Sequence, residues 1–191
     1  MERFEKMKQV LARRLSSVTL VAEATYMRHN LSAMFRTAEA FGIQQVHFIT
    51  DHPLSTSTAS RGSERWLDIL VYNKTKQCLG KLKSKGFSIY TAGFDEGAYT
   101  PETVPVDKPI ALVMGTELSG VSEVAQDMSD GTVMIPMAGF TQSFNVSVAT
   151  ACLLYRITER RREIIGNGDL SSEERERIFQ FWKKRESNGS S

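Results

Sequence analysis

The chain has 191 residues, of which 41% are hydrophobic and 24% are charged. This length suits one domain with a sizeable core, and the balance excludes a disordered or collagen-like chain. No apolar run approaches the roughly 20 residues of a membrane span, and the N-terminus lacks the apolar stretch of a signal peptide. We therefore expect a cytoplasmic protein that contacts no membrane.

Cysteine and histidine usage bears on metal binding. Two cysteines, Cys78 and Cys152, and three histidines show no spacing that is typical of metal ligands. This pattern indicates a reduced compartment and argues against a structural zinc, so we expect no bound metal. Cys152 falls beside the apolar stripe of a predicted helix, which favours a buried and unreactive thiol.

The net charge of +2 is unevenly distributed. Residues 1–20 carry five basic and two acidic side chains, and residues 156–191 carry nine and seven. The remaining middle of the chain is therefore acidic. Basic ends on an acidic middle are typical of a chain whose ends bind a polyanion such as RNA. The alternative is that both ends are ordinary helices with solvated, charged outer faces.

The N-terminal part of the chain is predicted to be two helices around one strand. Apolar residues at helical spacing predict a basic amphipathic helix over residues 3–15. A strand is expected at Val18–Ala22, followed by a helix that Asn30 caps and that ends at Gly42. On this second helix Arg36 falls on the face turned away from the core, where it is available for chemistry.

The middle of the chain alternates strands and helices, with a polar loop rich in Ser and Thr after the strand at 45–49. The predicted strands are Gln45–Ile49, Leu67–Tyr72, Phe87–Thr91, Ile110–Met114 and Thr132–Ile135, and the predicted helices are Thr75–Lys85 and Ser122–Met128. The apolar run at 110–114 is typical of a buried parallel strand. Strands separated by helices predict an α/β fold with a parallel sheet that helices cover on both faces.

The C-terminal part is predicted to hold two more helices. The first follows Asn145 and ends in three arginines at 160–162, which suit a helix C-terminus. Ser171 and Glu174 form a capping box for the second, whose Trp182 needs a surface to cover. We expect a single domain with a basic N-terminal helix in residues 1–17, a body over 18–165, and a C-terminal helix with a polar tail over 166–191.

Three loops beyond the carboxyl ends of predicted strands are the candidates for chemistry, because open parallel sheets bind ligands there. The three segments are Asn30-x5-Arg36, Gly115-x-Glu117-x2-Gly120, and Ile135-Pro-Met137 followed by Ser143-Phe144-Asn145. The chain has no G-x-G-x-x-G motif, no Walker lysine and no nucleophile elbow, so dinucleotide binding, ATP binding and hydrolase chemistry are unsupported.

These three segments, in this order, resemble the motifs of the SpoU/TrmH family of SPOUT methyltransferases. Such enzymes transfer a methyl group from S-adenosylmethionine (SAM) to a ribose 2′-hydroxyl of RNA. The resemblance implies that the C-terminal part of the α/β fold forms a trefoil knot and that the protein works as a homodimer. The segment Val10–Arg14 and the extra C-terminal helix most resemble the branch that modifies guanosine in the D-loop of tRNA.

The resemblance also implies the site, with SAM bound in the knot. The implied cofactor-binding residues are Ala92, Gly93, Gly115, Gly120, Ile135, Met137, Phe144 and Asn145, and the implied catalytic residues are Arg36, Asn30, Glu117, Ser143 and Asn145. The family usually has leucine at position 144. It also commonly reads Lys-Pro-His-Asn where this chain reads Met27-Arg-His-Asn30.

Arg36 is implied to activate the ribose hydroxyl. A guanidinium with a pKa above about 12 stays protonated, so we prefer a clamp on an adjacent RNA phosphate that also stabilises the developing alkoxide. Asn30 would position Arg36 or a substrate phosphate, or would simply cap its helix. Glu117 would bind Asn30 or the guanosine, or serve as an acid at a helix N-terminus. Ser143 and Asn145 would order the loop around SAM, or act only as helix caps.

The leading hypothesis is a SAM-dependent tRNA guanosine 2′-O-methyltransferase, with tRNA as its partner. One alternative keeps the chemistry but changes the substrate to ribosomal RNA or an anticodon-loop cytidine. Another alternative is a non-catalytic RNA-binding relative.

Overall fold

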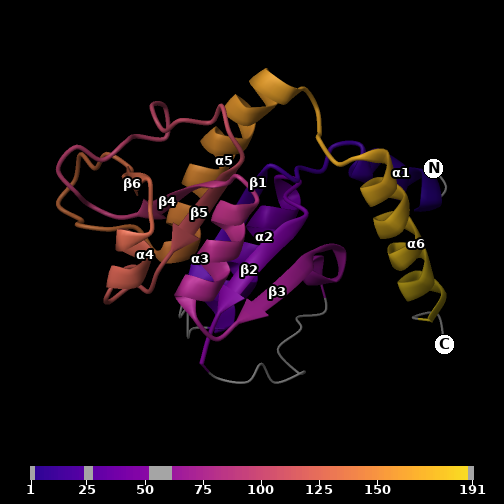
Figure 1. Cartoon of the computed structure of the whole chain (residues 1–191), viewed down its shortest axis with the longest axis horizontal. Coiled ribbons are helices and arrows are strands. Elements are labelled where there is room, and N and C mark those ends of the chain that lie inside the picture. Colours follow the sequence, from indigo (N-terminus) through magenta and orange to yellow (C-terminus); the bar gives the residue numbers. More distant parts are fainter. Residues whose placement is uncertain (1–2, 24–27, 52–61, 189–191) are drawn as a thin grey trace.

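The centre of the molecule is a six-stranded parallel sheet in the order β3-β2-β1-β5-β4-β6 (Figure 1). The structure, a computed structural model, describes residues 3–23, 28–51 and 62–188. The strands are β1 (Val18–Glu23), β2 (Gln45–Ile49), β3 (Asp68–Tyr72), β4 (Ser88–Ala92), β5 (Ile110–Met114) and β6 (Gly131–Val133). The helices are α1 (Arg3–Leu11), α2 (Arg28–Ala40), the short η2 (Ser63–Trp66), α3 (Thr75–Ser84), α4 (Glu123–Asp127), α5 (Val146–Ile165) and α6 (Ser172–Asn188). The predicted α/β fold with a parallel sheet is confirmed.

Helices cover both faces of this sheet, as the apolar run of β5 predicts. Successive side chains of a strand point to opposite faces. Leu112 and Met114 accordingly join the core cluster formed with α2 and α5, whereas Ala111 and Val113 join the cluster formed with α3 and α4. All of β5 is therefore buried, and the functional loops are confined to the ends of the strands.

The two terminal helices pack against each other at one side of the sheet (Figure 1). Met7 and Leu11 of α1 share a separate buried cluster with Ile178 and Trp182 of α6. The Trp182 ring meets the ring of Trp66 edge to face, with centroids 5.0 Å apart. The surface that Trp182 covers is thus formed by α1 and η2. The predicted capping box is also present, because the Glu174 amide donates to the Ser171 hydroxyl and the Ser171 amide donates to the Glu174 carboxylate.

The first helix is shorter than predicted, because the chain turns inward after Leu11. The side chain of Arg14 is fully buried, and its guanidinium donates to the Glu39 carboxylate at 2.7 Å and to the Ile43 carbonyl at 2.9 Å. It also lies over the Trp182 ring, 5.4 Å from the centroid. Arg14 therefore joins α2 to α6 and is not one of the cations that the N-terminus presents to solvent.

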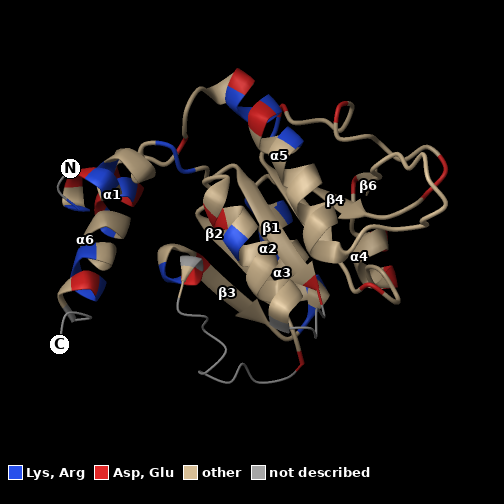
Figure 2. Ribbon diagram, turned by 180° about the vertical axis from the view of Figure 1, so that it is seen from behind, with Lys and Arg blue, Asp and Glu red and all other residues tan. Residues whose placement is uncertain are grey.

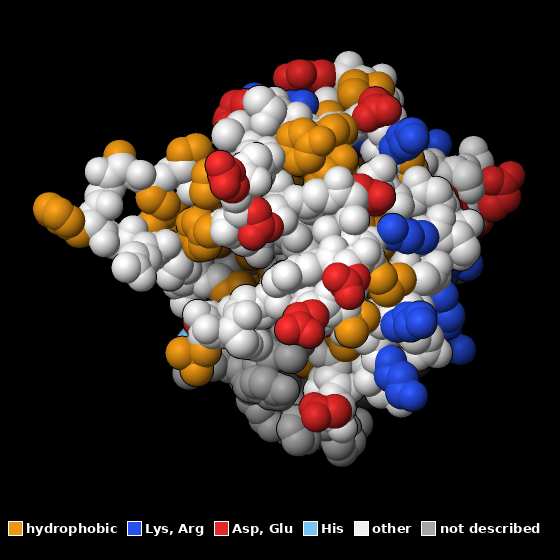
Figure 3. All heavy atoms as spheres, turned by 60° about the vertical axis from the view of Figure 1, so that its left-hand side comes forward, with side chains coloured by type: hydrophobic (Ala, Val, Ile, Leu, Met, Phe, Trp, Pro, Cys, Tyr) orange, Lys and Arg blue, Asp and Glu red, His pale blue; other side chains and the backbone are white. Residues whose placement is uncertain are grey.

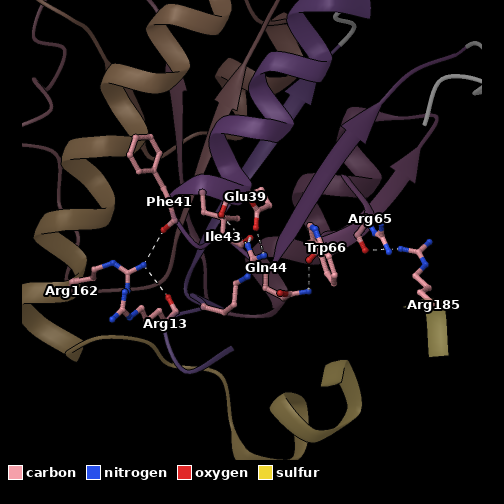
Figure 4. A network of polar contacts seen from close by, with 10 residues as sticks. Arg13, Glu39, Phe41, Ile43, Gln44, Arg65, Trp66, Arg162 and Arg185 are labelled. Carbon is pink, nitrogen blue, oxygen red and sulfur yellow. Dashed lines mark hydrogen bonds and ion pairs between the residues drawn. The ribbon is translucent and has the colours of Figure 1, made fainter. Parts of the chain in front are cut away.

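The arginines at 160–162 were predicted to end a helix, but in the structure they lie within α5 and bind other segments. Helix α5 continues to Ile165, and each arginine donates to backbone carbonyls of other segments. Arg160 donates to Pro101 and Val104, and Arg161 donates to Val106 and Asp107, at 2.7–2.9 Å. Arg162 donates to Arg13 at 3.0 Å and to Phe41 at 2.9 Å (Figure 4). These three cations stabilise the contacts of α5 with the rest of the chain.

Three further expectations differ from the structure. Helix α2 begins at Arg28, so Asn30 lies inside the helix instead of capping it. Strand β6 ends at Val133, because Met134 donates its amide to the carbonyl of Tyr99 in the preceding connection. Cys152 is exposed, because its neighbours Leu153 and Leu154 take the buried side of α5.

The polar loop predicted after β2 falls largely on residues 52–61, which lie outside the described residues. Within the part of the chain that the structure describes, no helix is long and apolar enough to cross a bilayer.

Candidate functional site

A cavity of about 280 Å³ opens at the carboxyl ends of β4, β5 and β6. Its walls come from the loop after β4, the Gly115–Gly120 loop after β5, the segment after β6 and the first turns of α5. The lining residues are Ala92, Gly93, Phe94, Met114, Gly115, Thr116, Glu117, Leu118, Gly120, Val133, Ile135, Ser143, Phe144, Val146, Ala149 and Leu153. This is the edge at which open parallel sheets bind ligands.

The Gly115–Gly120 loop folds back on itself at the mouth of this cavity. The amide of Thr116 donates to the carbonyl of Gly120 at 3.0 Å, and the amide of Gly120 donates to the carbonyl of Thr116 at 3.1 Å. A Cβ atom on Gly115 would lie only 2.0 Å from the carbonyl oxygen of Gly120. Position 115 therefore accepts only glycine in this conformation, and the backbone itself forms the wall of the cavity.

Asparagine and acidic side chains from all three sequence motifs meet beside the cavity. The amide of Asn145 donates to the side-chain oxygen of Asn30 at 3.2 Å, and the amide of Asn30 donates to the carboxylate of Glu117. Asn30 is 3% exposed, whereas Glu117 is exposed at the rim. The predicted clustering of Asn30, Glu117 and Asn145 is therefore present in the structure.

The direction of these hydrogen bonds is fixed by the backbone. The amide of Ser147 can only donate, and it donates to the side-chain oxygen of Asn145 at 2.9 Å. The Asn145 amide group must then face Asn30, whose own amide group must face Glu117. Asn145 therefore caps α5, which is one of the two roles considered for it, and it also orients Asn30.

Arg36 lies apart from this cluster. It lies six positions after Asn30 in the helix, which corresponds to about 120° around the α2 axis and about 9 Å along it. Its side chain is exposed and does not line the cavity. Within the described part of the chain, no hydrogen bond or ion pair holds its guanidinium. The structure brings Asn30, Glu117 and Asn145 together but leaves Arg36 outside the group.

The other implied site residues divide in the same way. Ala92, Gly93, Gly115, Gly120, Ile135, Ser143 and Phe144 line the cavity, whereas Met137 and Asn145 do not. Phe94 and Leu118 line it as well, and sequence reasoning missed both. An available signal was the position of Leu118, an apolar residue inside a tight polar turn.

Large apolar side chains are exposed around the rim. Leu118 and Phe140 are fully exposed, and Phe144 is 43% exposed. Figure 3 brings the side of the molecule with α4 and β6 forward and shows hydrophobic side chains gathered toward its left, away from a band of Lys and Arg side chains. Exposed apolar groups of this size are typical of a ligand-binding or protein-binding surface.

Metal ligation is not indicated in this region. Over residues 3–23, 28–51 and 62–188, no three His, Cys, Asp or Glu side chains group in a way that could hold a metal ion. The cavity instead combines apolar side chains with closely approaching backbone, a combination that suits an organic ligand with flat and polar parts.

The sequence and fold are similar to those of known RNA methyltransferases. The SpoU rRNA Methylase family profile matches residues 17–155. The tRNA (guanosine(18)-2′-O)-methyltransferase of Thermus thermophilus is 35% identical over 161 residues, covering 83% of each chain. Its Escherichia coli K12 counterpart is 30% identical over 184 residues, covering 93% of this chain and 80% of that protein. The crystal structure of the A. aeolicus TrmH/SpoU tRNA modifying enzyme matches with a TM-score of 0.83 and 31% identity over 96% of both chains. The chain therefore belongs to the SpoU rRNA Methylase family.

Proposed function

We propose that this protein transfers a methyl group from SAM to the ribose 2′-hydroxyl of a guanosine in the D-loop of tRNA. The observation that carries the proposal is the meeting of Asn30, Glu117 and Asn145 beside a cavity with a backbone wall. The relatives named tRNA (guanosine(18)-2′-O)-methyltransferase support the choice of substrate.

The cavity fits the cofactor that the proposal needs. Met114, Val133 and Leu153 offer apolar contacts for a flat adenine ring, and the backbone at Gly93 and Gly115 is close enough to bind polar edges. SAM, when bound, supplies a methyl group that its sulfonium has already activated. The remaining task of the protein is to hold the attacking oxygen in line, roughly 3 Å from that methyl group.

The exposed carboxylate of Glu117 is suited to hold the guanosine, because the Asn30 amide occupies one of its oxygens and fixes its orientation. The ribose hydroxyl is a weak nucleophile, so a cation close to it would stabilise the developing alkoxide. Arg36 fills this role as a clamp on the neighbouring RNA phosphate. Its guanidinium stays protonated, and the proton of the ribose hydroxyl passes to solvent water as the methyl group is transferred.

Because Arg36 does not line the cavity of its own chain, it serves the cavity of a second copy. A homodimer of this kind would also cover the apolar rim at Leu118, Phe140 and Phe144. On the outer side of α5, Val148 and Tyr155 are about half exposed and extend this apolar surface. The dimer therefore completes the site and buries groups that would otherwise remain in contact with water.

The C-terminal part of the body forms a trefoil knot, with α5 passing through the connection between β4 and β5. Two arginines of α5 support this path, because Arg160 and Arg161 donate to carbonyls of that connection. In optical tweezers, the unfolded chain stretched by its ends should reach a shorter contour length than an unknotted chain of 191 residues. A full-length contour would rule the knot out.

The tRNA backbone is contacted by α3 as well as by the terminal helices. Figure 2 shows both signs of charge on α1 and α6, and several of their cations have acidic partners, as in the pairs Arg177–Asp68 and Lys8–Glu5. Helix α3 contains no acidic residue, and five exposed lysines lie on or beside it, of which Lys83 pairs with Asp130 outside the helix: Lys74, Lys76, Lys81, Lys83 and Lys85. Phosphate groups would bind these exposed lysines, in the cytoplasm where tRNA is modified.

The test is transfer of labelled methyl groups from SAM to unmodified tRNA, with the product located by mass spectrometry of ribose-methylated nucleosides. We expect one methyl group on a D-loop guanosine. If only ribosomal RNA or an anticodon-loop cytidine is methylated, that RNA is the substrate and the D-loop guanosine is not. Absence of transfer, together with absence of SAM binding in calorimetry, would refute the enzyme activity.

A further inference from the structure

A buried carboxylate lies directly beneath the loop that forms the cavity wall. Glu23 is the last residue of β1 and is only 4% exposed. The preceding residue, Ala22, pairs with Met114 at the end of β5, so Glu23 lies beside the start of the Gly115–Gly120 loop. A buried carboxylate is unfavourable unless hydrogen-bond donors satisfy it. The presence of a buried carboxylate at position 23 therefore needs a structural explanation.

Three donors from two other segments satisfy this carboxylate. The amide of Ser122 donates to Oε2 at 2.8 Å, and the hydroxyl of Ser122 donates to Oε1 at 2.7 Å. The hydroxyl of Thr75, at the start of α3, also donates to Oε1. Glu23 thus joins β1, the start of α3 and Ser122, just beyond the cavity loop.

Ser122 lies two residues beyond the Gly115–Gly120 loop, at the start of α4. Its hydroxyl caps α4 by accepting from the amide of Ala125 at 3.2 Å, while the same hydroxyl donates to Glu23. The pairing of Met114 with Ala22 holds the start of the loop on the sheet, and the backbone pair between Thr116 and Gly120 closes the loop itself. With both ends held, the backbone between them has one position relative to the sheet.

We propose that Glu23 is a positioning residue for the cofactor: it does not line the cavity, but through Ser122 it fixes the loop that does. This inference rests on the proposed function, because SAM is the ligand whose binding it would control. The loop also carries Glu117, so the same anchor maintains the hydrogen bond between Glu117 and Asn30. Loss of the anchor would displace the backbone wall and weaken binding of SAM.

The chemistry requires a carboxylate at this position and not merely a polar group. The Ser122 amide can only donate, and the Ser122 hydroxyl already accepts from Ala125, so both need an acceptor. A glutamine has one acceptor oxygen and one donating amide group. Glu23→Gln keeps the volume of the side chain, but with its one oxygen turned toward the Ser122 amide it leaves the buried hydroxyl hydrogens of Ser122 and Thr75 without their acceptor.

The test compares Glu23→Gln with a matched variant at the opposite end of β1. Asp169 also accepts from two serines, receiving the amide of Ser16 at 2.5 Å and that of Ser17 at 3.2 Å, but it lies at the amino end of the sheet, away from the cavity. Both variants, Glu23→Gln and Asp169→Asn, are expected to lower the unfolding temperature. SAM affinity is measured by calorimetry well below both unfolding midpoints. Only Glu23→Gln should weaken it, by about tenfold or more, since small misplacements of binding groups are costly.

The outcomes separate the inference from the proposed function. If the wild-type protein binds SAM and Glu23→Gln binds it equally well, the positioning role is wrong and the proposed function stands. If the wild-type protein binds no SAM, the proposed function itself fails. If Glu23→Gln does not fold, Ser122→Ala decides, because it removes one donor and keeps the carboxylate. A several-fold loss of SAM affinity in Ser122→Ala, with tRNA affinity unchanged, supports the role, and unchanged SAM affinity overturns it.

Discussion

The side-chain amide of Asn30 donates to the carboxylate of Glu117, although 87 positions separate the two residues along the chain. Asn30 is buried inside α2, and Glu117 stands at the rim of the cavity. The orientation of Asn30 is set from its other side by Asn145, whose own orientation follows from the backbone amide of Ser147. A fixed chain of donors therefore ends at the exposed carboxylate of Glu117, at the mouth of the cavity.

Replacement of Asn30 by aspartate tests whether this direction matters. Asn30→Asp keeps the shape and the acceptor for Asn145, but it sets two carboxylates against each other. We expect methyl transfer to fall by about 100-fold, because Glu117 loses its orientation, with SAM affinity changed little. Lower pH should restore part of the activity, since one shared proton would rebuild the hydrogen bond. Steady-state kinetics across pH measure both effects, and an unchanged kcat would show that the amide is only structural.

A subunit-mixing experiment tests whether Arg36 serves a second copy of the chain. Arg36→Ala keeps an intact cavity, whereas Gly115→Ala destroys the cavity and keeps Arg36, because the new Cβ would lie 2.0 Å from the Gly120 oxygen. Each variant alone is expected to be inactive. Their co-expressed heterodimer would contain one complete site and regain up to about half of the activity per dimer. Failure to complement, with heterodimers present, would contradict shared sites.

Gly139→Ala is the matched control for the glycine variant. A Cβ atom on Gly139 would meet no atom closer than 4.0 Å, and its backbone conformation suits any residue. We expect Gly139→Ala to bind SAM as the wild-type protein does, while Gly115→Ala shows no binding in calorimetry.

The exposed lysines on and beside α3 predict where the RNA backbone lies. Lys74 and Lys76 are exposed after β3, at the carboxyl end of the sheet. The double variant Lys74→Ala/Lys76→Ala should weaken tRNA binding and lower the slope of log affinity against log salt by about two, since each lysine contacts one phosphate. Lys108, exposed at the amino end of β5, is the control, and Lys108→Ala should leave the slope unchanged. Equal slopes for all three proteins would exclude α3 from the interface.

Local sequence patterns were sufficient to predict most strands of the sheet. The apolar run at Ile110–Met114 predicted β5 to the residue, because a strand buried on both faces has an unmistakable composition. The second motif follows β5 and the third follows β6, as predicted, whereas the first lies within α2. The topology that brings them together could be reached only through the family resemblance, since periodicity does not determine the order of strands.

The errors have a common physical origin in tertiary partners. Asparagine is a residue type that often caps helices, but the side chain of Asn30 instead donates to Glu117 and accepts from Asn145. No local sequence pattern reveals these two partners. Counting charges assigned Arg14 and Arg161 to a basic surface, whereas both are buried and bound to backbone carbonyls. A carbonyl acceptor has no sequence signature, so such arginines are found only from the structure.

His47 is a buried titratable group that makes the stability of the fold depend on pH. It lies in β2, is 2% exposed, and stacks on Tyr72 with ring centroids 5.7 Å apart. Within the described residues, neither ring nitrogen has a hydrogen-bond partner. Burial, with a smaller contribution from the nearby charge of Lys85, lowers the pKa of His47 from 6.5 to about 4.

Stability should therefore decrease on acidification. Between the unfolded pKa of 6.5 and the folded pKa of about 4, the unfolded chain binds a proton that the folded protein rejects. The contribution of His47 to the free energy of unfolding is fully present above pH 6.5. On acidification the free energy of unfolding falls by about 1.4 kcal/mol per pH unit, with a total loss of about 3 kcal/mol near pH 4. His47→Phe keeps an aromatic ring against Tyr72 but cannot take up a proton, so this part of its acid dependence should disappear. Urea unfolding at a series of pH values measures the free energy of both proteins. Parallel curves between pH 6.5 and 4 would show that His47 does not control the acid sensitivity of the fold.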